Sequence, residues 1–110
     1  MKVKELAEKI GLDIVAGKDG AEKEVSGCYI GDLMSLAMAR VEEGNVWITI
    51  QTNINVVAVA ALKEAGCVIL ADGCVPDENT SQKADEEDIP VLVSEKSAYE
   101  LALLLGDMKI

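Results

Sequence analysis

The sequence predicts an α/β fold, a three-layer αβα sandwich in which helices cover a mostly parallel sheet of four to five strands. Three apolar runs begin at Val46, Cys67 and Pro90, at spacings of 21 and 23 residues. Each spacing accommodates one strand, one helix and two short loops. The runs are continuous rather than alternating, which is typical of parallel strands covered on both faces. We therefore expect one α/β domain over residues 1–110, because a chain of this length has room for a single core.

The amino-terminal part of the chain predicts one helix and two short strands. Residues 1–10 have the apolar spacing of an amphipathic helix, and Gly11 can cap its carboxyl end. Strands are expected at residues 12–16 and 24–30, on either side of a turn at residues 17–20. The short connection favours a hairpin-like pairing of these two strands.

The middle of the chain predicts two helices around a buried strand. The expected elements are a helix at 33–41, a strand at 46–50 and a helix at 54–65. Asp32 is a suitable N-cap for the first helix, and Asn53 or Asn55 for the second. The second helix is apolar on almost every side until Lys63. We expect another element or a second subunit to cover more than its sheet face.

The carboxyl-terminal part repeats the strand-helix pattern. The expected elements are a strand at 67–71, a polar helix at 77–87, a strand at 90–93 and a closing helix at 96–105. Ser94 is the expected N-cap of the closing helix. The helix at 77–87 has almost no apolar stripe, which predicts either a solvated edge helix or a mobile one.

Charge and cysteine content exclude several classes of partner. The chain carries 20 acidic and 10 basic residues, a formal net charge of −10. Nucleic-acid binding relies on Lys and Arg that displace counterions, and anionic lipid surfaces repel such a chain in the same way. Neither nucleic acid nor membrane is therefore expected as a partner. The three cysteines form no CxxC pair, so we expect reduced thiols and a cytoplasmic location.

The common signatures of catalysis are missing from the sequence. There is no histidine, which excludes the Ser-His-Asp and Cys-His arrangements and most zinc sites. Neither the phosphate-binding GxxxxGK[ST] loop nor the dinucleotide fingerprint GxGxxG is present. We therefore expect a protein that is not an enzyme and that holds no cofactor and no metal.

A ligand site is expected beyond the carboxyl ends of the parallel strands, where open α/β sheets bind ligands. The polar and glycine residues expected there are Ser26, Gly27, Cys28, Asp32, Gln51, Thr52, Asn53, Asn55, Asp72 and Gly73. Residues 51–55 place four polar side chains before a helix, whose free N–H groups favour an anion. Helix capping alone can also account for Asp32 and for part of the cluster at 51–55.

The segment Glu24-Val25-Ser26-Gly27-Cys28 resembles the motif that gives the DRTGG domain family its name. The resemblance continues through residues 29–35, 46–52 and 55–60, and through the segments 89–92 and 97–100. It is strongest to short stand-alone members found in anaerobes beside hydrogenase and iron–sulfur genes. Only Gly27 of the name motif is retained, so a role that depends on the family's arginine does not carry over.

The resemblance implies a regulatory or spacer domain that tends to dimerise and is not the catalytic part of its protein. Related domains occur in phosphotransacetylases, between the CBS domains of pyrophosphatases, and at the amino terminus of phosphocarrier-protein serine kinases. The leading hypothesis is a homodimeric sensor or adaptor that binds a nucleotide or another anionic metabolite at the strand edge. One alternative is a pure interaction module, with a redox or hydrogenase-associated partner. The other is an enzyme that uses Asp32, Asp72 or Cys28.

Overall fold

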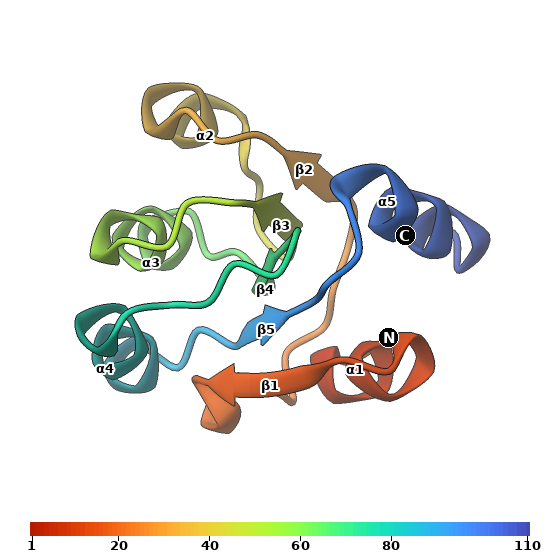
Figure 1. The fold of residues 1–110 in the computed structure, drawn as a ribbon, viewed down its shortest axis with the longest axis horizontal. Helices are drawn as coiled ribbons and strands as arrows, with labels where there is room; N and C mark the ends of the chain where they lie inside the picture. Colours follow the sequence, from red (N-terminus) through yellow and green to blue (C-terminus); the bar gives the residue numbers. More distant parts are fainter.

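One five-stranded sheet, in the order β1-β5-β4-β3-β2, organises this computed structural model, which describes residues 1–110 (Figure 1). The strands are β1 (Asp13–Ala16), β2 (Cys28–Ile30), β3 (Val46–Thr49), β4 (Cys67–Leu70) and β5 (Val91–Val93). The helices are α1 (Val3–Ile10), α2 (Met34–Arg40), α3 (Ile54–Leu62), α4 (Glu78–Glu87) and α5 (Ala98–Asp107), with a 3₁₀ turn at Lys18–Gly20. Strands β2 to β5 are parallel, and only β1 is antiparallel to its neighbour β5. The predicted α/β class is confirmed.

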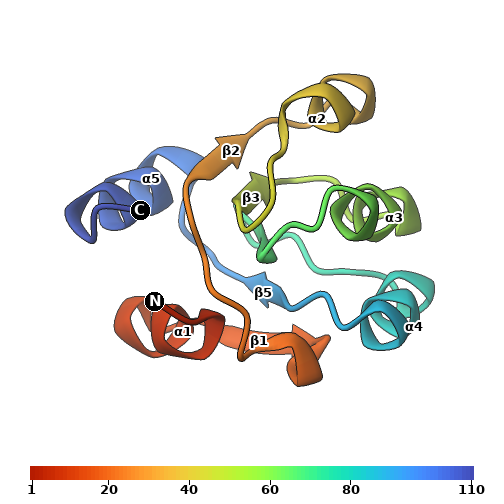
Figure 2. The ribbon, with the colours of Figure 1, turned by 180° about the vertical axis from the view of Figure 1, so that it is seen from behind.

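The sheet lies between two helical layers of unequal size. Helices α2, α3 and α4 cover one face, and α1 and α5 cover the other (Figures 1 and 2). Every residue of β3 and β4 is buried, which is why these two strands read as continuous apolar runs in the sequence. Trp47 of β3 is fully buried among the α2–α4 layer, and its indole N–H donates to the carbonyl of Gly31 at 3.0 Å.

The expected hairpin between the first two strands is wrong, because β1 and β2 form opposite edges of the sheet. The connecting segment pairs with the start of the chain instead. The N–H of Val3 donates to the carbonyl of Lys23 at 2.9 Å, and the N–H of Val25 donates to that of Met1 at 2.8 Å. The carbonyl of Lys23 and the N–H of Val25 are therefore bonded to the start of the chain, and β2 pairs with β3.

Of the four predicted helix caps, two are confirmed and two, Asp32 and Ser94, are wrong. Gly11 adopts a left-handed conformation with φ 68° and ends α1 as expected. Asn53 caps α3, since its side chain accepts a hydrogen bond from the N–H of Asn55. The cap of α5 is Ser97 rather than Ser94, because Ser97 and Glu100 form a reciprocal capping box. The hydroxyl of Ser94 accepts from the N–H of Lys96 at 3.0 Å within the preceding turn.

Neighbouring helices cover the flanks of α3, as its apolar composition predicts. It lies between α2 and α4 and buries four residues, Val56, Val57, Val59 and Ala60 (Figure 1). The polar helix α4 is a solvated edge helix that buries only Thr80 and Ala84. Its Thr80 hydroxyl donates to the carbonyl of Thr52 at 2.7 Å, which ties α4 to the loop before α3. None of the helices is long and apolar enough to cross a membrane.

Candidate functional site

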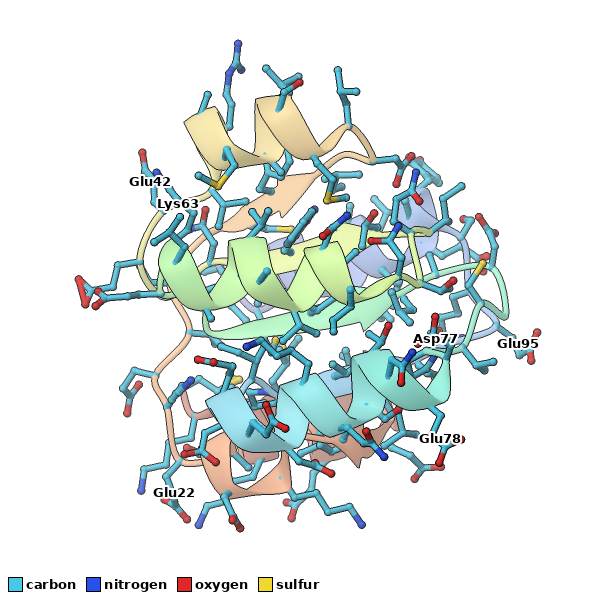
Figure 3. All side chains as sticks on the ribbon, turned by 90° about the vertical axis from the view of Figure 1, so that its left-hand side faces the viewer. Glu22, Glu42, Lys63, Asp77, Glu78 and Glu95 are labelled. Carbon is cyan, nitrogen blue, oxygen red and sulfur yellow. The ribbon has the colours of Figure 1, made fainter.

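Most of the residues expected at the ligand site lie together beyond the carboxyl ends of β2, β3 and β4. This group, which we call the strand-end rim, consists of Asp32, Gln51, Thr52, Asn53, Asn55, Asp72 and Gly73. Parallel strands bring these loops to one edge of the sheet. Figure 3 shows this edge at the end where Asp77 and Glu95 project, while Glu42 and Lys63 project at the opposite end.

The prediction that Ser26, Gly27 and Cys28 share this rim is wrong. Strand β2 begins at Cys28, which pairs with Val46 at the start of β3, so these three residues lie at the amino-terminal edge of the sheet. The side-chain amide of Asn45 donates to the carbonyl of Ser26 at 2.8 Å and fixes the segment there. The sequence placed the strand four residues too early, because Val25 is apolar and buried although it precedes the strand.

Asp32 joins the ends of two strands and does not cap α2. The N-cap residue of that helix is Leu33, which has no side-chain hydrogen bond to offer. The Asp32 carboxylate accepts instead from the hydroxyl of Thr49 at 2.9 Å and from the N–H of Ile50 at 3.0 Å. Asp32 therefore fixes the distance between the loop after β2 and the loop after β3.

Replacing Asp32 by alanine is expected to lower the free energy of unfolding by about 1 kcal/mol, because Thr49 is buried and its hydroxyl loses this partner. Asp32→Asn keeps an oxygen acceptor at the same position and is expected to cost less than half as much. Urea unfolding followed by circular dichroism measures both variants. Equal losses in the two variants would show that the carboxylate does not act through these two hydrogen bonds.

The loop between β3 and α3 supplies side-chain donors that the chain itself does not use. The Asn53 side chain is engaged, since its oxygen accepts from the N–H of Asn55 at 3.0 Å and its nitrogen approaches the Gln51 oxygen at 3.4 Å. The amide nitrogens of Gln51 and Asn55 and the hydroxyl of Thr52 donate no hydrogen bond within the chain. Three residues with uncommitted neutral donors therefore lie at the amino end of α3, where the helix dipole is positive.

A topological switch point lies between β4 and β5, because the chain leaves these strands toward opposite faces, to α4 and to α5 (Figure 1). Ligand crevices of open α/β sheets form at such points. Here the two loops are joined: the N–H of Asp72 donates to the carbonyl of Lys96, and the N–H of Gly73 to that of Ser94, both at 2.9 Å. A Cβ on Gly73 would stand 2.7 Å from a carboxylate oxygen of Glu95. The Glu95 side chain therefore lies against Gly73 at this switch point.

The amino-terminal edge of the sheet contains a hollow that the sequence did not reveal. It has a volume of about 730 Å³, and its polar lining consists of Lys23, Glu24, Ser26, Glu43, Glu64 and Glu87. The Lys23 ammonium is already engaged, donating to the carbonyl of Asp88 at 2.7 Å. Its lining comes from separate helix ends and loops, and in the sequence these glutamates look like ordinary solvated surface. The excess of carboxylates makes this hollow unfavourable for an anion.

The thiols of Cys28 and Cys67 are poorly suited to nucleophilic chemistry at neutral pH. Burial raises the pKa of Cys67 to about 12, and partial desolvation raises the pKa of Cys28 to about 11 although that residue is exposed. Both thiols are therefore protonated near pH 7, and the thiolate is the reactive form. No three cysteine, aspartate or glutamate side chains converge in a way that could hold a metal ion.

Comparison with known proteins identifies one family, and solved structures of similar fold include a regulatory region of a pyrophosphatase. The family model named DRTGG domain matches residues 5–108. The structure contains the CBS and DRTGG domains of the regulatory region of Clostridium perfringens pyrophosphatase, complexed with the activator diadenosine tetraphosphate. It matches with a TM-score of 0.70 at 11% identity, over 94% of this chain and 45% of that chain. This chain thus spans less than half of that structure, and at such low identity the likeness is one of fold. No curated protein matches the sequence.

Proposed function

This chain belongs to the DRTGG domain family, and from that premise we propose that it is a regulatory domain that binds a small ligand and catalyses no reaction itself. The family match over residues 5–108 is the observation that carries this proposal. The pyrophosphatase domains of similar fold belong to a regulatory region that was captured with a nucleotide activator. The raised pKa of Cys28 and the engaged Asp32 carboxylate agree with a role other than catalysis.

The proposed ligand is a nucleotide or another anionic metabolite, bound at the strand-end rim. The uncommitted donors of Gln51, Thr52 and Asn55 stand at the positive end of the α3 dipole, which is a favourable position for a phosphate group. The carboxylates of Asp72 and Glu95 make the neighbouring β4–β5 switch point unfavourable for the same group. We therefore place the anionic part of the ligand next to α3 and the uncharged part toward the switch point.

A thermal-shift assay with adenine mononucleotides, diadenosine tetraphosphate and inorganic phosphate tests this proposal. A ligand present at about 100 times its dissociation constant stabilises the folded state by about 2.7 kcal/mol. For a domain of this size the midpoint of unfolding should then rise by about 10 °C. The double variant Gln51→Ala, Asn55→Ala removes two of the three donors and is expected to lose most of that shift. It leaves the Asn53 cap in place.

Glu42→Gln provides the matched control, because Glu42 lies at the opposite end of the sheet (Figure 3). The control is expected to keep the full shift. An absence of stabilisation by every one of these compounds would overturn the nucleotide proposal. A shift that survives unchanged in the double variant would place the ligand elsewhere on the molecule.

A homodimer is the second part of the proposal, and apolar side chains on the outer surface of the α2–α4 layer support it. Leu33, at the start of α2, is 65% exposed and Leu36 of α2 is 43% exposed, although the chain is strongly acidic. The same surface favours the alternative of a pure interaction module, in which the partner is another protein, such as a redox or hydrogenase-associated one. Sedimentation velocity at micromolar concentration separates a homodimer from a monomer that requires a different partner.

A further inference from the structure

The two edges of the sheet differ in how well they are protected against further strand pairing. At the β1 edge the register shifts between Ile14 and Ala16, and charged residues of the following turn and of α4 flank the strand. Irregular register and charge are the usual means by which proteins block an exposed edge. Strand β2, with the sequence Cys-Tyr-Ile, contains no charge and pairs with β3 in regular register. The β2 edge therefore lacks the protection that the β1 edge has.

The outer side of β2 presents backbone groups that have no neighbouring strand. Toward β3, the carbonyl of Gly27 accepts from Val46, and the N–H of Gly31 donates to Ile48. Because bonding direction alternates along a strand in a parallel pair, the N–H and C=O groups of Cys28 and Ile30 point away from β3. Strand β2 is last in the sheet order, so nothing in the chain pairs with those groups.

Apolar side chains flank this open edge. Ile30 is 46% exposed on β2, and Leu33 and Leu36 at the start of α2 are 65% and 43% exposed. Met34 and Ala37 of the same helix pack against the core, so the exposed leucines leave apolar surface uncovered at this end of α2. Helix α2 is the last helix of its layer, with α3 on one side only (Figure 1). The exposed flank of α2 therefore borders the β2 edge.

We propose that two copies of this chain associate through their β2 edges around a twofold axis, with β2 pairing antiparallel to its symmetry mate. Such an interface is isologous, since each outward N–H of one copy meets a carbonyl of the other. The partner is a second copy, because the surface formed by residues 28–39, which we call the strip, can face a molecule of the same net charge without repulsion. From Cys28 to Ala39 the only charged residue is Asp32, whose carboxylate is bound to Thr49 and Ile50. Elsewhere a partner with the same net charge of −10 would bring carboxylates together.

The area that a stable dimer needs indicates how much of this edge takes part. A specific interface buries about 800 Å² on each partner, against a total accessible surface of 5675 Å² for this chain. Three strand residues cannot supply that area alone. The exposed flank of α2, with Leu33 and Leu36, must therefore pack against its symmetry mate. This assignment of the interface rests on the homodimer proposed above.

The test compares oligomeric state in three variants by sedimentation velocity across a micromolar concentration series. Ile30→Lys combined with Leu36→Glu places charges on the strip, and the dimer is expected to weaken by at least about tenfold. Leu33→Glu changes a side chain that is 65% exposed, which avoids a folding defect, and is expected to weaken the dimer in the same direction. Leu62→Glu on the outer surface of α3 is the matched control and should leave the dimer intact.

The outcomes distinguish failure of the β2 interface from failure of the homodimer itself. A wild-type monomer at every concentration would overturn both proposals. A dimer that persists in the β2-edge variants but dissociates in Leu62→Glu would overturn the β2 interface and leave the homodimer standing. A circular dichroism spectrum and an unfolding midpoint like those of the wild type establish that each variant is folded before it is compared.

Discussion

Replacing Trp47 by alanine is expected to lower the free energy of unfolding by about 3–5 kcal/mol, the range for truncation of a large buried aromatic side chain. Trp47 has no exposed surface and is the largest fully buried side chain of the protein. Its neighbours come from α2 and α3, so the cavity would open between the sheet and both helices. The indole N–H also donates to Gly31, and this carbonyl would lose its donor. Since domains of this kind are stable by about 5–15 kcal/mol, the loss is a large fraction of the total.

Urea unfolding followed by far-ultraviolet circular dichroism measures this loss without relying on tryptophan fluorescence, which the substitution removes. Trp47→Phe keeps an aromatic ring at the same position and gives up the hydrogen bond to Gly31, so it separates packing from hydrogen bonding. We expect its loss to be less than half that of Trp47→Ala. A loss below about 1 kcal/mol for the alanine variant would be incompatible with full burial of the ring.

Gly17→Ala is expected to cost about 2–5 kcal/mol, because the substitution is unfavourable for two independent reasons. Gly17 has φ 68°, a left-handed conformation that costs other residues about 1–2 kcal/mol. A Cβ at this position would also overlap the carbonyl oxygen of Ile89, so the chain leading into β5 must shift. Overpacking of this kind typically adds about 1–3 kcal/mol.

Gly11→Ala isolates the first of these two reasons. Gly11 has the same φ of 68°, but a Cβ there would have no neighbour within 4 Å. Its expected cost is therefore about 1–2 kcal/mol, from the backbone conformation alone. Thermal unfolding of the two variants side by side gives the difference, which measures how tightly the turn after β1 packs against the chain before β5. Equal costs would refute the close approach of Gly17 to Ile89.

The parts of the fold that could be predicted are those in which local sequence and tertiary role coincide. Strands β3 and β4 are buried on both faces, so their sequences are continuously apolar, and Gly11 and Asn53 carry out the cap roles that their residue types favour. The partner of β1 could not be predicted in this way. It lies in β5, near the other end of the chain, and no local pattern in residues 12–30 indicates that.

The candidate site could be predicted only in part, for reasons that are also non-local. Asp32 precedes a helix, where its residue type predicts an N-cap. Its carboxylate instead accepts from the hydroxyl of Thr49 and the N–H of Ile50, at the end of another strand. Ser26 and Gly27 were assigned to the wrong end of β2, because a strand of three residues gives too little pattern to fix its start. The hollow at the amino-terminal edge is formed by helix ends whose sequence separation hides their proximity.

The three consecutive strand–helix units that place α2, α3 and α4 on one face of the sheet have a consequence for the order in which the protein folds. From β2 to β5 each strand pairs with the next strand in the chain, so each pairing closes a loop of only one strand–helix unit. The β1–β5 pairing must instead bring together Asp13 and Val93. Loop closure costs about 0.6 kcal/mol for each doubling of length, so this pairing carries about 1 kcal/mol of additional entropy cost. We therefore expect the antiparallel edge to form late in folding and to open first in native-state hydrogen exchange.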